Sequence, residues 1–428
     1  MGKAKVGSRP NEFKYGMALY GAAWPPGEHF FVCGGGGHGL VNRIVWARYR
    51  GGRVSDQVGE YKLGNATPMR MALAPSGSAL LLGMSDGGVR RFQLDLTGPT
   101  PRVIEVSSAF SERFEALRGE VTAMAFSGDG GLLAVGFITG DVKVLSYPGM
   151  KHLAEFKLPD GVKDLDFART PSGGNERWPL LATACEDGKC RLWDVAAGAE
   201  VCQLPLPKGM EKAQVTRCRF ARTAPILYAV LNQSRGGCHV AAYGPPSDPQ
   251  RRGSSGGTAP PQRPSSAGGG APGAWALLKR HEVDSGPNAA LEISPGGTLL
   301  ALGQAEGGLL AVDARTLHVV RSEPQASMVF VTRVAFSDDG GRILAVGADA
   351  NAFVLDMREG GGGGGSSFCL LLLLLLLALA AGLGFVLHTN PEAAARAAEV
   401  WEALQRDARV RGGLSAVQGL VGRFTDEL

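Results

Sequence analysis

A glycine-rich stretch near the start of the chain has the spacing most suggestive of chemistry. Gly34, Gly36 and Gly39 satisfy the Gly-x-Gly-x-x-Gly fingerprint of dinucleotide-binding folds. With Val41 added, the same run also satisfies the glycine-rich loop of protein kinases. Glycines at these spacings let a backbone approach a phosphate closely, so the first hypothesis to examine is a nucleotide site.

The residues that follow the glycines argue against a nucleotide site. A dinucleotide fold needs a helix directly after the turn, because the helix N-terminus holds the pyrophosphate. Here Leu40 to Trp46 is rich in β-branched and aromatic residues, which predicts a strand. The lysine strand, His-Arg-Asp loop and Asp-Phe-Gly motif of a kinase are missing, as is the Gly-Lys-Ser/Thr of a P-loop. We therefore predict a hairpin connection between two strands.

A monovalent cation is the second chemistry that this loop could support. Two residues would suffice to close a hairpin, yet the chain uses more here. Backbone carbonyls beside an asparagine amide oxygen suit a weakly hydrated cation such as potassium. The alternative is a flexible turn without an ion. The candidate potassium ligands are the carbonyls of Gly34, Gly35, Gly36, Gly37 and Gly39 and the side chain of Asn42.

Composition excludes several other classes of function. The chain has 428 residues, 44% apolar and 20% charged, with a formal net charge of +4. This balance is that of an ordinary globular protein, and without a dense Lys/Arg block it does not favour nucleic-acid binding. The 7 cysteines form no Cys-x-x-Cys pair, so neither a zinc ribbon nor a redox motif is indicated.

Internal repetition defines the elements that must position the loop. Turn, apolar strand, polar turn and second strand recur at intervals of about 50 residues, the signature of a WD-type β-propeller. One unit ends in a full Trp193-Asp194 signature. Each unit has a small residue near the end of its apolar strand, and the comparable positions are Gly34, Gly83, Gly136, Ala184, Gly303 and Gly347.

The predicted fold class is therefore all-β, a seven-bladed β-propeller of the WD-repeat type over residues 1–357, followed by a single C-terminal transmembrane helix and a short helical tail. We expect Val121–Phe126 and Val331–Phe336 to be innermost strands. Part of the segment Glu12–Trp24 is expected to complete the last blade. A linear stack of sheets is the alternative, and its exposed edges would promote aggregation.

Four further segments break the repeat pattern. Residues 244–271 are rich in Pro, Gly and Ser and predict a disordered insertion within one blade. Residues 358–367 predict a Gly/Ser linker. Residues 368–387 carry no charge and include a run of leucines from Leu370 to Leu377, which predicts one membrane span. Residues 388–428 are predicted to be a short, helical lumenal tail.

The location of the protein follows from the ends of the chain as given. The first ten residues are polar and basic, unlike a secretory signal, so we expect the propeller to stay in the cytosol. The tail after the span would then be lumenal. Its last four residues, Thr425-Asp426-Glu427-Leu428, resemble the Lys/His-Asp-Glu-Leu retrieval signal with the first position altered. We therefore predict a single-pass protein of the endoplasmic reticulum membrane.

This combination of propeller, C-terminal anchor and glycine loop ending in asparagine resembles one family. The members of that family are the endoplasmic-reticulum WD-repeat exchange factors that activate the Sar-type small GTPase of COPII coat assembly. The family is also known as the prolactin regulatory element-binding protein-like family. The resemblance covers residues 1 to about 390, and the loop "CGGGGHGLVN" is its specific part. It implies a guanine-nucleotide exchange factor with a Sar-type GTPase as partner, acting in transport from the endoplasmic reticulum to the Golgi.

The resemblance also implies roles for particular residues. The loop would bind potassium and project towards the GTPase, and Asn42 would support both its order and exchange. The implied exchange loop consists of Gly34, Gly35, Gly36, Gly37, His38, Gly39, Leu40 and Asn42. No covalent chemistry, small-molecule substrate or nucleic-acid partner is expected. The alternative is a non-catalytic, membrane-anchored propeller scaffold that binds protein partners.

Overall fold

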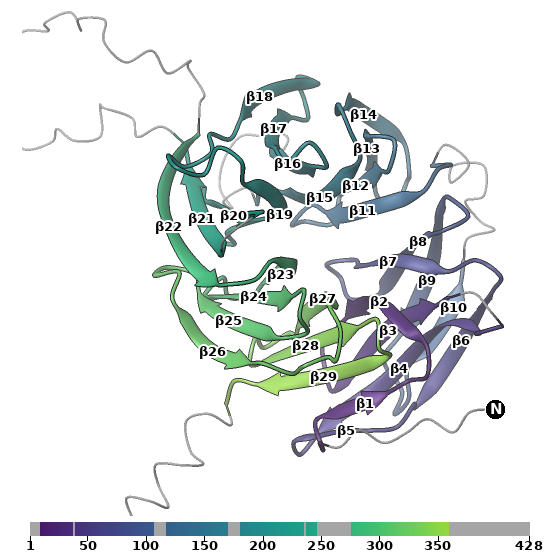
Figure 1. Cartoon of the computed structure of the whole chain (residues 1–428). Helices are drawn as coiled ribbons and strands as arrows, with labels where there is room; N and C mark the ends of the chain where they lie inside the picture. The colour runs from purple at the N-terminus through teal and green to yellow at the C-terminus, as the bar shows by residue number, and fades with distance from the viewer. Residues whose placement is uncertain are drawn as a thin grey trace, which may run out of the picture. The chain divides into compact units, whose positions relative to one another are not determined.

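The computed structural model describes residues 9–36, 39–106, 117–169, 180–234, 237–245 and 275–358. Every regular element in these ranges is a β-strand, and the strands form seven antiparallel sheets. The sheets follow one another around a common centre (Figure 1). The prediction of an all-β, seven-bladed propeller is confirmed.

Each blade runs from an inner to an outer strand. The first four blades consist of β2 (Ala18–Ala23), β3 (His29–Gly35), β4 (Asn42–Arg50) and β6 (Gly59–Gly64), with the short β5 (Arg53–Val54) beside β4; β7 (Pro68–Leu73), β8 (Ala79–Met84), β9 (Val89–Asp95) and β10 (Arg102–Glu105); β11 (Val121–Phe126), β12 (Leu132–Phe137), β13 (Asp141–Ser146) and β14 (His152–Lys157); and β15 (Val162–Phe167), β16 (Leu180–Cys185), β17 (Cys190–Asp194) and β18 (Ala199–Gln203).

The remaining three blades have the same order. They consist of β19 (Gln214–Phe220), β20 (Leu227–Asn232), β21 (Cys238–Gly244) and β22 (Ala276–Asp284); β23 (Asn288–Ile293), β24 (Leu299–Gln304), β25 (Leu309–Asp313) and β26 (Val319–Glu323); and β27 (Val331–Phe336), β28 (Arg342–Gly347) and β29 (Asn351–Asp356) with β1 (Glu12–Lys14) as their outer strand.

The N-terminal strand closes the ring. β1 pairs antiparallel with β29, so that Glu12 lies opposite Phe353 and Lys14 opposite Asn351. The inner strands of the last and first blades are also joined, since the Thr332 hydroxyl donates to the Leu19 carbonyl at 2.7 Å. The predicted completion of the last blade by the segment before the first unit is confirmed, and the linear stack is excluded.

Three of the recurring small residues, Gly83, Gly136 and Gly303, let neighbouring blades pack closely, whereas Gly34 faces Ala18 of its own blade. A Cβ on Gly83 would lie 2.7 Å from Val121, on the inner strand of the next blade. On Gly136 it would lie 2.6 Å from Val162, again one blade further on. Each glycine therefore leaves room for a valine of the following inner strand. The predicted inner strands, β11 and β27, have the bounds that the sequence indicated.

Several predicted segments fall outside the described residues. The chain divides after Met357, and of the part that follows only Arg358 is described. The predicted span 368–387, the tail 388–428 and the rest of the linker 358–367 therefore stay predictions. No helix that could cross a membrane occurs among the residues that are described. The insertion lies between two strands of one blade, as expected, but Gly244 itself still belongs to β21 and pairs with Ala276.

Candidate functional site: the glycine loop of the first blade

The glycine run lies at the tip of the hairpin between β3 and β4, as predicted, but the loop is shorter than the sequence indicated. Gly34 and Gly35 are the last residues of β3, where Gly34 pairs with Leu19 and Arg43. The connection proper runs from Gly36 to Val41. Two of the predicted loop residues, 37 and 38, lie outside the described residues.

Gly34 and Gly35 are required because the base of the loop is tightly packed. A Cβ on Gly34 would lie 1.9 Å from the Ala18 carbonyl oxygen, on the neighbouring strand. A Cβ on Gly35 would lie 1.9 Å from the Asn42 amide oxygen, across the hairpin. Neither overlap can be relieved by a small shift, since Ala18 is held in the sheet and Asn42 is buried.

The glycines further out serve a conformational purpose. Gly36 has φ of 137° and Gly39 has φ of 82°, backbone conformations that L-residues with a Cβ rarely adopt. Around both positions there is space: a Cβ on Gly36 would meet its nearest neighbour, the Tyr20 hydroxyl, at 3.8 Å, and one on Gly39 would meet nothing within 4 Å. The described part of the loop thus combines a packed base with open space around Gly36 and Gly39.

Asn42 fixes the end of the loop to two other segments. Its side chain is 5% exposed, and its amide nitrogen donates to the Gly64 carbonyl at the end of β6, at 3.0 Å. Its amide oxygen accepts from the Thr67 hydroxyl at 3.1 Å, just before the second blade begins. Asn42 therefore connects the loop to its own blade and to the next one, which fits the predicted role in loop order.

Arg43 strengthens the same base from the other side of the strand. Its guanidinium pairs with Glu60 of β6 at 2.6 Å and donates to the Tyr15 carbonyl at 2.7 Å. Tyr15 in turn donates its backbone N–H to Ala350, in the tip between β28 and β29. The loop base is therefore tied to the closing blade as well.

The described ligand candidates fit a potassium ion in their chemistry. They are all neutral oxygens, which suit a hard cation and not a thiolate-seeking metal. The Asn42 amide oxygen lies directly against Gly35, and a carboxamide oxygen has a second lone pair besides the one facing Thr67. Among the described residues no group of three or more His, Cys, Asp or Glu side chains could hold a metal ion.

Exposed apolar side chains lie within the loop and on the same face of the propeller, and the sequence reasoning missed most of them. Leu40 and Val41 are each 49% exposed, and on the adjacent last blade Met328 is 80% exposed, followed by Val329 and Phe330. Met328 donates its backbone N–H to Asp349 in the β28–β29 tip, so it lies on the same face of the propeller as the glycine loop. The available signal was an apolar run that begins three residues ahead of β27.

Comparisons with known proteins support the repeat pattern and the fold. Residues 151–194 match the family "WD domain, G-beta repeat", and they end at the Trp193-Asp194 signature. The chain is also similar to the solved structure of Sqt1 from Chaetomium thermophilum, with a TM-score of 0.57 and 14% identity over 81% of this chain and 98% of that one. At this identity the similarity concerns the fold alone.

Two curated proteins of Arabidopsis thaliana give a more specific similarity. SEC12-like protein 2 is 25% identical over 326 residues, which are 74% of this chain and 72% of that protein. SEC12-like protein 1 is 28% identical over 169 residues, 39% of each chain. The resemblance drawn from the glycine loop and the domain order is thereby confirmed: the chain is a WD-repeat propeller similar to the SEC12-like proteins.

Proposed function

We propose that this protein is a guanine-nucleotide exchange factor for a Sar-type small GTPase at the endoplasmic reticulum membrane. One observation carries the proposal: the β3–β4 loop has a base fixed by Asn42 and Arg43 and an open tip beside exposed apolar side chains. A projecting, anchored loop next to an apolar surface suits insertion into a partner protein. The family resemblance implies the partner class, and the similarity to SEC12-like proteins supports it.

Exchange of this kind needs no covalent chemistry. The factor binds the nucleotide-free GTPase more tightly than the loaded form, and by thermodynamic linkage it lowers nucleotide affinity by the same factor. The loop would supply this differential binding by occupying space that only the nucleotide-free GTPase offers. Leu40, Val41 and Met328 to Phe330 would supply contacts common to both states.

Potassium belongs to the proposal as a structural ion. The carbonyls of Gly36 and Gly39 with the Asn42 amide oxygen would hold it, and Gly34 and Gly35 would position the strand end beneath. A bound cation supplies a common centre for several carbonyl dipoles, so it would reduce the number of conformations open to the tip. That effect lowers the entropy lost when the loop docks on the GTPase.

The predicted membrane span completes the proposal. A GTPase that acts on a membrane meets an anchored exchange factor at a higher effective concentration than a soluble one. The retrieval-like tetrapeptide at residues 425–428 would keep the factor in the endoplasmic reticulum. The COPII transport role would follow from this placement.

A GDP-release assay tests the proposal. The full chain in mild detergent is added to a Sar-type GTPase loaded with a fluorescent GDP analogue, and the release rate is measured in potassium and in N-methylglucamine buffers. We expect acceleration by the wild type, and a release rate at least tenfold slower with Gly36→Val. Tyr20→Phe is the matched control on the neighbouring strand. Unchanged release with the wild type, or equal release with Gly36→Val, would contradict exchange through this loop, whereas indifference to potassium would contradict only the ion.

A scaffold function is the second candidate, and the exposed apolar side chains favour it. Propellers commonly bind partners on one face, and Met328 to Phe330 offer such a surface whether or not exchange occurs. Met328→Ser separates the two functions. An exchange factor would show weaker saturation by the GTPase with an unchanged maximal release rate, while a scaffold would show binding with no release at all.

A further inference from the structure

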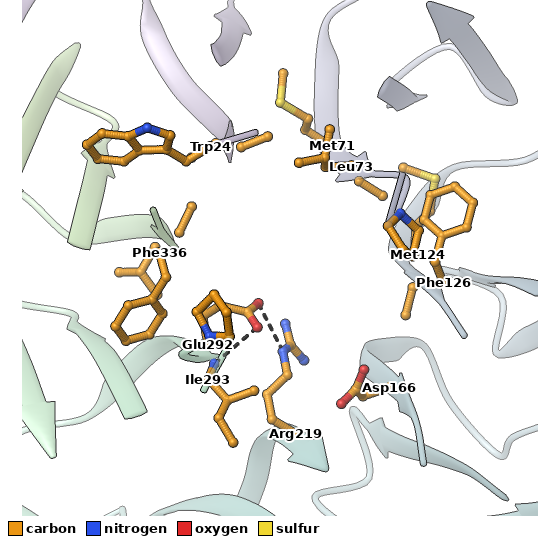
Figure 2. Close-up of a pocket in the computed structure, with 18 of the residues that line it drawn as sticks. Trp24, Met71, Leu73, Met124, Phe126, Asp166, Arg219, Glu292, Ile293 and Phe336 are labelled. Carbon is orange, nitrogen blue, oxygen red and sulfur yellow. Dashed lines mark hydrogen bonds and ion pairs between the residues drawn. The ribbon is translucent and has the colours of Figure 1, made fainter. Parts of the chain in front are cut away.

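A second candidate site lies at the centre of the ring, away from the glycine loop. A pocket of about 480 Å³ lies among the inner strands and is lined by charged side chains that include Arg70, Asp164, Arg219, Glu292 and Arg333. Figure 2 shows Arg219, Asp166 and Glu292 among the lining residues, with Trp24, Met71 and Phe336 around them. A volume of this size is typical of small-molecule sites.

The pocket opens on the face opposite the glycine loop. Its rim includes Pro75, Gly128 and Pro295, in turns that join the first and second strands of their blades. The glycine loop joins a second strand to a third. Because the strands of each blade are antiparallel, these two kinds of turn lie on opposite faces of the ring. A ligand in the pocket would therefore leave the loop face free.

The repeated strand geometry places three arginines at equivalent positions of the inner strands, and therefore at one level along the axis of the ring. Every inner strand has an irregularity in register after its first or second paired residue. The residues just after this irregularity are therefore equivalent between blades. In the seven blades these residues are Gly21, Arg70, Ala123, Asp164, Arg217, Ala290 and Arg333. Three arginines thus share one level of the ring with a single carboxylate.

Three of the four carboxylates that line the pocket already accept hydrogen bonds from other groups. Asp164 accepts from Arg219 at 2.7 Å and from the Cys218 N–H at 3.1 Å. Asp166 accepts the Phe220 N–H at 2.8 Å. Glu292 pairs with Arg219 at 3.2 Å and with a second arginine, at position 222, at 3.3 Å. Asp164 therefore forms its ion pair with Arg219, although its charge also acts on the three arginines of the ring level.

Those three arginines have no carboxylate partner among the described residues. Arg70 donates to the Thr122 and Met69 carbonyls. Arg217 donates to the carbonyl of its own neighbour Thr216, and its buried Nε has no hydrogen-bond partner. Arg333 makes no hydrogen bond or ion pair with a described residue, although it lines the pocket. Burial together with the charges of Arg70 and Arg217 lowers the pKa of Arg333 well below its usual value.

We propose that this central pocket binds a small, phosphate-bearing anion between Arg70 and Arg333, which line it, with Arg217 beside them at the same level of the ring. Unpaired guanidinium groups in a confined space repel one another, and an anion with several oxygens would relieve that repulsion. Guanidinium forks also match the geometry of phosphate oxygens better than that of a monatomic anion. The ligand class is a soluble di- or oligophosphate, independent of the GTPase contact on the other face.

The depth of the pocket and the charges at its rim select a small ligand over a macromolecule. Arg333 lies inside the ring, where the surface of a membrane or a nucleic-acid backbone could not reach. Asp338 and Glu292 also line the pocket, and they would repel an extended polyanion lying across the opening. A compact phosphate compound could pass between these side chains.

Isothermal titration of the full chain in mild detergent with inorganic pyrophosphate tests the proposal. The wild type should bind one pyrophosphate and show a higher melting temperature in its presence. Arg333→Gln should weaken binding at least about tenfold, since removal of one partner of a close charge pair has effects of this size or larger. Arg333→Lys should retain part of the affinity. Arg280→Gln removes the same charge from an exposed position on the outer strand β22 and should bind like the wild type.

Several outcomes would overturn the proposal. These are no heat of binding with the wild type at millimolar pyrophosphate, equal binding by Arg333→Gln, or an equal loss with Arg280→Gln. Folding of Arg333→Gln can be followed in phosphate-free buffer, where its melting temperature should match or exceed that of the wild type because an unpaired charge is removed. If the variant melts earlier there, Arg333 has a structural partner and the site is wrong.

Discussion

The hairpin tips of the first and third blades occupy the same place in the repeat but are built differently. In blade three the tip runs from Ile138 to Gly140 and is fully engaged: the Gly140 N–H donates to Phe137 at 3.0 Å, and Leu158 donates to the Gly140 carbonyl at 2.9 Å. In blade one, no such backbone bond joins Gly36, Gly39, Leu40 or Val41, the described residues of the loop, to another described residue. The repeat thus holds one tip within the scaffold by backbone bonds that the described part of the other tip lacks.

The same substitution in the two tips should show the largest contrast. A Cβ at Gly140 would lie 2.7 Å from the carbonyl oxygens of Leu158 and Asp160, whereas one at Gly36 meets nothing closer than 3.8 Å. Both positions carry backbone strain of about 1–3 kcal/mol for a valine. Gly140→Val adds overpacking of about 1–3 kcal/mol. Thermal and urea unfolding followed by tryptophan fluorescence should rank Gly140→Val well below Gly36→Val, and equal stability of the two variants would contradict the comparison.

Asn42→Ala should have an intermediate effect. It removes the bonds to Gly64 and Thr67 and leaves a carbonyl oxygen without its donor, which typically destabilises by about 1–3 kcal/mol. Thr67→Ala and the double variant complete a mutant cycle, and the coupling between the two side chains should be about 0.5–1.5 kcal/mol. If the losses in unfolding free energy of the two single variants simply add in the double variant, the hydrogen bond from Thr67 does not contribute to the role of Asn42 in the loop.

The smallest effect is expected at Asp141, in the tip of blade three. Hydrogen bonds from Lys157 and from the Thr139 hydroxyl hold the pKa of this carboxyl below its usual value. A lowered pKa in the folded state stabilises the protein above the unfolded pKa of about 4, and this stabilisation is lost as pH falls through the folded value. Asp141→Asn should therefore lower stability at pH 7 by less than about 1 kcal/mol, because the pair is exposed.

The corresponding measurement compares the unfolding of the wild type and Asp141→Asn at pH 7 and pH 3. The difference between the two proteins should shrink in acid. A difference that grows in acid would mean that Asp141 does not hold the tip through its charge. At the corresponding register of blade one the paired residues are the uncharged Asn42 and Gly64, so this loop should not share the pH dependence.

Much of the fold could be predicted because it repeats. The apolar strand with a small residue near its end indicates both the blade and the close packing of the next one, as the contact between Gly136 and Val162 demonstrates. The pairing of β1 with β29 also followed, since a ring with seven units leaves one strand to be supplied from elsewhere. These features depend on local patterns and on closure, and the sequence contains both.

The details of the site could not be predicted, because they depend on partners distant in sequence. Nothing local indicates that Asn42 reaches Thr67 in the next blade, or that Gly34 must be small because of Ala18. The three central arginines are separated along the chain by whole blades. Only the closed ring, with the same irregularity in every inner strand, brings Arg70 and Arg333 to one level.

Closure by β1 has a consequence for the order of synthesis. Glu12–Lys14 is made first, but its partner Asn351–Asp356 is made only after every other strand of the propeller. Until then the nascent chain has no finished last blade, and the ring stays open whatever the earlier blades have formed. The ring can therefore close only when synthesis has passed β29 and approaches the predicted membrane segment. A truncation that removes the first fourteen residues would leave β29 with an unpaired edge in every finished molecule.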